Sequence, residues 1–531
     1  MLKRMTIAAG TLGISLAFAG PALAAPSPVH HSGRPAAHRQ TIRQAVKPAT
    51  SGGPKLYVNG GSGNDEGGAN TCRLASNPCA TITQAINIAP STATIEVAGG
   101  TYKEQLAIVG KNLTINGAGS TRTIIDPTSL ATDTNDPNYS GPQAVIVEFL
   151  NTTGGGLTNL EVDGAGSGVS EPSDGSCDQD FVGVEFANSS GTLSSDAVTG
   201  VQEQQSYFGC QQGLSVYVSN NSGGAETVKM SSLAVTQYQK DGIDCDGADT
   251  TCTITGSTVT GIGATGLTAQ NGIETDGGVT ATITKNTVTG NSYTSPNYSS
   301  GGGYYTASGI LVYDSTNATI TGNTVNHNDE NIVGYEDGNY AGGDGTWTIK
   351  TNKVTAGVNN TGGAVPLGFG VGDGIDLDGV GQTGSGQAGV VTADVAGNTV
   401  TGNADWGIAL FGATGATIGG TSTSAANTAS SNADDGIYLG EFSPGIPSSD
   451  NTVEKNTASR NSDDGILADG ADSSGDQQAI GNTFSGNTMK SDVRYDAEDR
   501  SSGAGTSGTG NTWSGNKCTP AQDSSPLGLC S

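Results

Sequence analysis

The feature that most constrains the fold of this chain is a phrase that recurs through its second half: Asp or Asn, then Gly-Ile, then alternating residues. Its isoleucine returns at Ile408, Ile437 and Ile466, a spacing of 29 residues (437 − 408 = 29; 466 − 437 = 29). A second phrase lies between the copies, for example KNTVTGN at 285–291. Fixed periods of about 20–50 residues are typical of solenoids, in which short strands bury a shared core only by stacking.

Alternation within each phrase predicts which side chains form that core. The isoleucines of the first phrase are expected to face inward: Ile243, Ile273, Ile310, Ile375, Ile408, Ile437 and Ile466. The valines of the second phrase are expected to line another wall: Val259, Val288, Val325 and Val400. Long helical patterns are absent, and the strands are rich in Thr, Val and Ile. The sequence therefore predicts an all-β fold, a single-stranded right-handed parallel β-helix.

Composition divides the chain into four segments. Residues 1–24 combine Lys3 and Arg4 with a short apolar run and a small-residue cleavage site, as in a secretory signal peptide. Residues 25–54 are basic, lack acidic residues and are expected to form a disordered linker. Residues 55–517 are expected to form the β-helix, and 518–531 a disulfide-closed tail. We therefore expect a secreted, extracellular protein with no membrane insertion.

The charge of the folded segment limits its partners. All 50 acidic residues follow residue 54, with 16 of the 22 basic residues, so the formal charge there is 16 − 50 = −34. This charge argues against nucleic acid as a partner. It is compatible with divalent cations or neutral glycans, whereas an acidic polymer would need bound calcium or a local basic patch. We expect a monomer.

Eight cysteines in an exported chain predict disulfides. Proximity in sequence favours four pairs, although eight cysteines allow 105 connectivities. The pairs are Cys72 with Cys79, Cys177 with Cys210, Cys245 with Cys252, and Cys518 with Cys530.

The residues one and three positions after each isoleucine should point outward and form a possible site. Four of them are predicted to bind a cation, with calcium as the candidate: Asp244, Asp246, Glu274 and Asp276. Asp376 and Asp378 are acid/base candidates, since outward residues two apart on one strand lie about 7 Å from each other, within the range of paired carboxylates in inverting glycosidases. Aromatic side chains in the same positions are predicted to stack on sugar rings: Tyr313, Tyr335, Phe411 and Tyr438.

Two regions resemble known families. LYVNGGSGNDEG (56–67), ATITQAINIAPSTATIEVAGGTYKEQLAI (80–108) and KNLTINGAGSTRTIID (111–126) resemble the start of pectin-lyase-like right-handed β-helix proteins. That resemblance implies a short helix, near 83–89, capping the N-terminal end. KDGID (240–244) and GDGID (372–376) resemble the acidic strand of polygalacturonase-type hydrolases, which adds Asp373 to the acid/base candidates. That family's Gly-His-Gly and Arg-Ile-Lys motifs are absent.

The function that these features favour is binding, and either hydrolysis or lyase cleavage, of an extracellular polysaccharide. Two alternatives stay open at this stage. One is a non-catalytic structural or adhesive β-helix of the cell wall, and the other is an inactive relative that only binds glycan.

Overall fold

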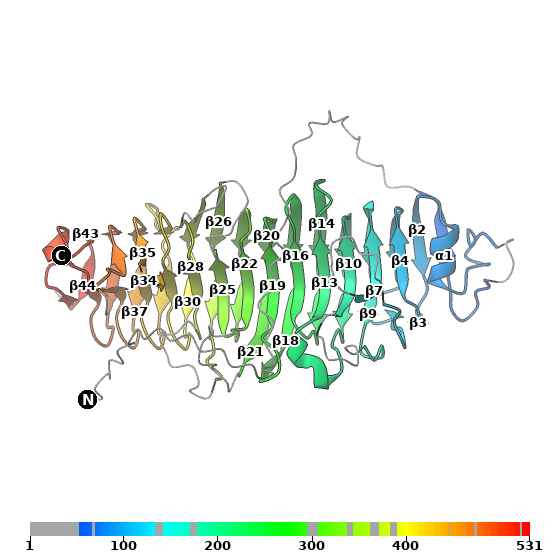
Figure 1. The fold of residues 1–531 in the computed structure, drawn as a ribbon, viewed down its shortest axis with the longest axis horizontal. Coiled ribbons are helices and arrows are strands. Elements are labelled where there is room, and N and C mark those ends of the chain that lie inside the picture. The colour runs from blue at the N-terminus through cyan, green and yellow to red at the C-terminus, as the bar shows by residue number, and fades with distance from the viewer. Residues whose placement is uncertain are drawn as a thin grey trace, which may run out of the picture.

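The chain folds into a right-handed parallel β-helix, an elongated rod with helix α1 (Ile82–Ile88) near one end and the C-terminal strands at the other (Figure 1). This computed structural model describes residues 53–65, 70–132, 142–169, 177, 179–294, 306–336, 344–361, 371–382, 390–443, 445–471, 475–520 and 523–531. The predicted signal peptide and nearly all of the predicted linker lie outside these residues.

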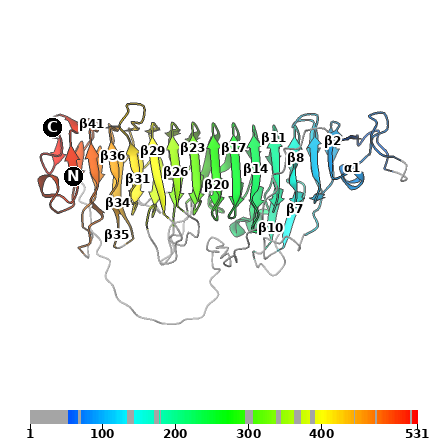
Figure 2. The same cartoon turned by 90° about the horizontal axis from the view of Figure 1, so that it is seen from above.

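Each coil visits three parallel sheets in turn, and Figure 2 shows strands of sheet 1 side by side along the rod. Sheet 1 contains β1 (Lys55–Val58), β2 (Thr92–Val97), β5 (Asn112–Asn116), β8 (Thr153–Thr158), β11 (Ser190–Ser194), β14 (Glu226–Ser231), β17 (Thr250–Thr255), β20 (Thr280–Thr284), β23 (Asn317–Thr321), β26 (Gly345–Lys350), β29 (Val391–Ala396), β32 (Thr417–Gly419), β36 (Thr452–Glu454), β40 (Thr483–Ser485) and β43 (Thr512–Ser514). Sheet 2 contains β3 (Gly100–Tyr102), β6 (Thr123–Ile125), β9 (Glu161–Asp163), β12 (Ala197–Thr199), β15 (Ala234–Thr236), β18 (Thr258–Thr265), β21 (Thr287–Tyr293), β24 (Thr324–Asn326), β27 (Lys353–Thr355), β30 (Thr399–Thr401), β33 (Thr428–Ser430), β37 (Thr457–Ser459), β41 (Thr488–Lys490) and β44 (Lys517–Thr519).

Sheet 3 carries the candidate site. Its strands are β4 (Leu106–Val109), β7 (Gln143–Leu150), β10 (Asp180–Ala187), β13 (Gly213–Ser219), β16 (Asp241–Asp246), β19 (Asn271–Asp276), β22 (Ser308–Tyr313), β25 (Glu330–Tyr335), β28 (Ile375–Asp378), β31 (Ile408–Phe411), β34 (Ile437–Ser443), β38 (Ile466–Ala468), β42 (Ala497–Asp499) and β45 (Ser524–Ser525). The two strands that depart from this path are β35 (Ile446–Ser449), antiparallel to β34, and β39 (Ala479–Ile480), which pairs with β35. The 3₁₀ helices are η1 (Gln205–Cys210) and η2 (Thr506–Gly508).

The predicted register is confirmed along sheet 3. Each isoleucine of the repeat pairs with the isoleucine of the next coil, and Ile332 of β25 fills the place between Ile310 and Ile375. All of these isoleucines, and the four predicted valines of sheet 2, are fully buried. They belong to one continuous apolar core that runs the length of the rod.

The Gly of Gly-Ile is required by the narrow interior. A Cβ on Gly242, Gly272 or Gly374 would lie 2.6, 2.4 or 2.3 Å from the Cγ1 of a valine of sheet 2, closer than packed carbon atoms approach. The glycine and the isoleucine after it both face the core, so the strict inward–outward alternation breaks there. The residue before the glycine consequently returns to the outer face.

Asparagine ladders close the turns between coils, where the side chains are structural. The buried side chain of Asn398 donates from Nδ2 to Ile349 O (2.8 Å) and to Asn427 Oδ1 (3.0 Å). The Oδ1 of Asn398 accepts hydrogen bonds from both nitrogens of Asn352 (2.8 and 3.0 Å). Each asparagine therefore satisfies turn groups that stacking removes from water.

The capping helix and the four cysteine pairs agree with the sequence predictions. Helix α1 begins one residue before the expected Thr83 and packs on the first strands, and its Thr81 N-cap accepts a hydrogen bond from Gln84 N (3.1 Å). All four predicted cysteine pairs form disulfides. Disulfides are typical of oxidising compartments outside the cytosol. No helix in the described part of the chain is long and apolar enough to cross a membrane.

Candidate functional site

The outer face of sheet 3 presents three side chains from each coil: those two positions before, one after and three after the buried isoleucine. The sequence predicted that the positions one and three after the isoleucine face outward. The position two before the isoleucine also faces outward, because Trp406, which precedes Ile408 by two residues, stacks on the outward-facing Tyr438 with ring centroids 4.4 Å apart. Asp373 occupies the equivalent position one coil earlier.

Strand β28 brings the three acid/base candidates together between apolar neighbours. Asp376 pairs with Val333 on one side and Ala409 on the other, and Asp378 pairs with Tyr335 and Phe411. Asp373 and Asp376 are 0% and 2% exposed. The Trp406 N–H donates to Asp373 Oδ1 (3.0 Å), whereas Asp373 Oδ2 and Asp376 Oδ1 have no hydrogen-bond partner.

This environment raises the pKa values of all three carboxyl groups. Burial, reinforced by the neighbouring carboxylates Asp378 and Asp373, raises the pKa of Asp376 well above its usual range. Burial raises the pKa of Asp378 to about 7, opposed by a hydrogen bond with Asp376. Burial, together with repulsion from Asp405 and Glu330, also raises the pKa of Asp373 well above its usual range. Burial therefore holds Asp376 and Asp373 towards their protonated forms, whereas Asp378 is poised to exchange a proton near neutral pH.

Aromatic side chains flank β28 on both sides. Towards the N-terminus the ring of Tyr335 lies 5.2 Å from Tyr313 and 5.7 Å from Phe442, a residue that reaches back from the β34–β35 hairpin. Towards the C-terminus Phe411 lies 5.2 Å from Trp406 and 5.4 Å from Tyr438. Tyr313 is buried, whereas Tyr335, Phe411 and Tyr438 keep part of their surface exposed.

The predicted cation-binding carboxylates lie three and four coils before β28, on β19 and β16. Asp244 is paired with Glu274, and Asp246 with Asp276, as the register predicted. Burial first, then Asp246 and Glu274, raises the pKa of Asp276 to about 9. Burial and Glu274 likewise raise the pKa of Asp244 well above its usual range. The crowding is therefore present, and calcium binding there stays a prediction.

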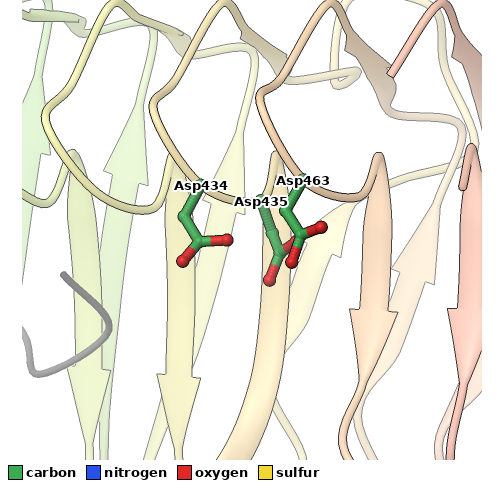
Figure 3. Close-up of side chains that lie close together, drawn as sticks. All are labelled: Asp434, Asp435 and Asp463. Atoms are coloured by element: carbon green, nitrogen blue, oxygen red, sulfur yellow. The ribbon is translucent and has the colours of Figure 1, made fainter. Parts of the chain in front are cut away.

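A different group of three carboxylates brings its oxygens within 4.8 Å of one another in the described part of the chain. It consists of Asp434, Asp435 and Asp463, and Figure 3 shows Asp435 and Asp463 side by side, with Asp434 beside them. Asp435 already accepts hydrogen bonds from Asp464 N (2.8 Å) and Trp406 Nε1 (3.2 Å). Asp463 forms an ion pair with Arg494 (3.2 Å). These contacts tie the group into the turns before β34 and β38.

Comparison with known proteins shows similarity in fold. No protein-family model matches the chain, and no curated protein matches its sequence. A double mutant of the periplasmic alginate epimerase AlgG is similar over 76% of this chain and 79% of its own, with 14% identity and a TM-score of 0.45. The Azotobacter vinelandii mannuronan C-5 epimerase AlgE6 A-module matches over 83% and 95%, with 15% identity and a TM-score of 0.42. The pectate lyase Pel9A matches over 90% and 80%, with 14% identity and a TM-score of 0.34.

Sequence reasoning missed two aromatic residues of the site. Trp406 stands directly before a Gly-Ile pair, so its place in the repeat was the available signal, but strict alternation would have turned it inward. Phe442 lies in a hairpin inserted into one coil, and no repeat position predicts its contact with Tyr335.

Proposed function

We propose that this chain binds a polysaccharide along the outer face of sheet 3 and hydrolyses it at β28. The observation that carries the proposal is a set of three carboxyl groups, two on β28 and one just before it, placed between two groups of aromatic side chains. Burying carboxylates without hydrogen-bond partners is unfavourable for a purely structural surface. Aromatic faces beside acid/base groups are the combination that a sugar polymer requires, because pyranose C–H faces stack on rings.

The roles follow from the surroundings of each carboxyl group. Asp376, which burial holds towards its protonated form, is the proposed general acid that gives its proton to the glycosidic oxygen as the C–O bond breaks. Asp378, with a pKa of about 7, is the proposed general base that removes a proton from the attacking water. Asp373 is a positioning residue, since its Oδ1 accepts a hydrogen bond from the backbone N–H of Trp406.

The absence of a strong base favours hydrolysis over elimination. The strands of sheet 3 contain no lysine or arginine that could remove a proton from a sugar carbon in an elimination. A carboxylate pair that exchanges one proton with the leaving group and one with water is sufficient for hydrolysis.

A polysaccharide panel tests this function. Each polymer is incubated with the purified protein, and new reducing ends and the ultraviolet absorbance of unsaturated sugars are measured together. Hydrolysis predicts reducing ends alone, and the Asp376→Asn variant should lose about 10²-fold or more of the rate while keeping its fold. Unsaturated products would identify a lyase instead. Neither binding nor products with any polymer would favour the structural or adhesive alternative.

A further inference from the structure

The three sheets differ sharply in charge. No strand of sheet 3 contains a lysine or arginine, whereas its strands hold these acidic residues: Glu148, Asp180, Glu185, Asp241, Asp244, Asp246, Glu274, Asp276, Glu330, Asp376, Asp378, Glu441, Glu498 and Asp499. Sheets 1 and 2 are balanced. Their strands contain the bases Lys55, Lys229, Lys350, Lys353, Lys490 and Lys517, and the acids Glu96, Glu161, Asp163, Glu226, Asp394 and Glu454. Among the strands of the β-helix, the unbalanced negative charge therefore belongs to sheet 3, which carries the candidate site.

The basic residues next to sheet 3 form ion pairs with acidic residues on coils to either side of β28. Lys240 lies 3.9 Å from Asp241 at β16, and Arg494 and Arg500 form ion pairs on the coils of β38 and β42. All 16 basic residues that follow residue 54 (22 − 6 = 16) belong to the described part of the chain. None of their ion pairs there reaches Glu274, Glu330 or the carboxyl groups of β28.

Buried carboxyl oxygens at the centre of this face lack donors. Asp373 Oδ2 and Asp376 Oδ1 accept no hydrogen bond, although the two residues are at most 2% exposed. A ligand that supplies N–H or O–H donors with a positive charge would satisfy the oxygens and offset the repulsion between neighbouring carboxyl groups. The aromatic groups on either side leave an apolar surface for the rest of that ligand.

From this combination we propose that the polysaccharide recognised by sheet 3 bears amines: it is a cationic polymer of 2-amino-2-deoxy sugars. The inference rests on the proposed function and names its substrate class. An ammonium group offers three donors and a charge, and the pyranose ring that carries it offers a C–H face to Phe411 and Tyr438, which are partly exposed. Strands about 4.8 Å apart are spaced like successive units of an extended β-1,4-linked chain. A polyuronate would meet only like charge on this face.

Three β-1,4-linked oligomers of equal length isolate the role of the amine. Glucosamine, N-acetylglucosamine and glucose oligomers differ only in the group at C2, which is an amine, an acetamide or a hydroxyl. Calorimetric titration at a mildly acidic pH, where the sugar amines are protonated, should show the glucosamine oligomer binding at least about tenfold more tightly than the other two. That preference should shrink as salt is raised, because it is electrostatic.

A matched pair of variants tests whether the preference for the amine arises at sheet 3. Asp376→Asn keeps the shape of the site and replaces a carboxyl group, which can pair with the ammonium as a carboxylate, by an amide that cannot, so it should reduce the preference for the amine towards unity. Asp394→Asn removes one carboxylate from sheet 1 and should leave the preference unchanged. Circular dichroism confirms the fold of both variants before the titration.

The remaining outcomes contradict the inference in distinguishable ways. Equal affinity for all three oligomers would leave polysaccharide binding intact and overturn recognition of the amine. Tighter binding of oligogalacturonate, with or without calcium, would also overturn it. Absence of binding by these oligomers and by the whole polysaccharide panel would overturn the substrate class together with the proposed function.

Discussion

Replacing Asn398 with alanine tests whether the asparagine ladder holds the coils together. The substitution removes four side-chain hydrogen bonds: two that Nδ2 donates, to Ile349 O and Asn427 Oδ1, and two that Oδ1 accepts from Asn352. At about 1 kcal/mol net for each bond, Asn398→Ala should lower the free energy of unfolding by about 4 kcal/mol. The loss should be this large because the site is 1% exposed and water cannot replace the missing partners.

Urea unfolding followed by circular dichroism measures the change, with Asn87→Ala as the control. Asn87 is exposed on α1, so its truncation should alter the free energy of unfolding by less than about 0.5 kcal/mol. Equal effects of the two substitutions, or a loss below about 1 kcal/mol for Asn398→Ala, would refute the stabilising role assigned to the ladder.

Three further predictions concern the core, the carboxyl groups and calcium. Gly374→Ala places a Cβ 2.3 Å from Val400 Cγ1 and should destabilise the fold by about 1–3 kcal/mol, whereas Gly209→Ala, with no atom within 4 Å, should have little effect in the same urea assay. The raised pKa values of Asp378 (about 7) and Asp276 (about 9) mean that folding favours the protonated forms of both groups. The stability that they contribute is therefore fully present below the pKa of about 3.9 of an unfolded aspartate, and it is lost as pH rises through about 7 and about 9. The urea concentration at the midpoint of unfolding should therefore decrease as pH is raised from mildly acidic to alkaline. An equally steep decrease in the Asp276→Asn variant would contradict the role given to Asp276. Calcium should raise the melting temperature relative to chelator if Asp244, Asp246, Glu274 and Asp276 bind it, and an equal shift in the Asp246→Asn/Asp276→Asn variant would remove that site from consideration.

The sequence predicted those parts of the fold that the repeat specifies. The pairing of Asp244 with Glu274 followed from placing Ile243 and Ile273 in the core, because a one-residue slip would have exposed every isoleucine. The cysteine pairs followed because the partners are close in sequence, and the cap helix followed from resemblance to other β-helices.

Non-local features of the site could not be predicted in this way. The break in alternation at Gly374 depends on the distance to Val400 across the interior, which a single strand does not reveal. The shielding of Asp376 depends on Val333 and Ala409, which come from other coils of different length. Such burial determines pKa values, so the assignment of acid and base required the structure.

A crystal structure of the Asp376→Asn variant with the oligosaccharide that it binds most tightly would show whether sheet 3 is the face that binds and cleaves polysaccharide. We expect a sugar chain on the outer face of sheet 3 that crosses β28 between Tyr335 and Tyr438, with a glycosidic oxygen within hydrogen-bond distance of residue 376. An oligosaccharide bound to sheet 1 or sheet 2, with the outer face of sheet 3 empty, would contradict it.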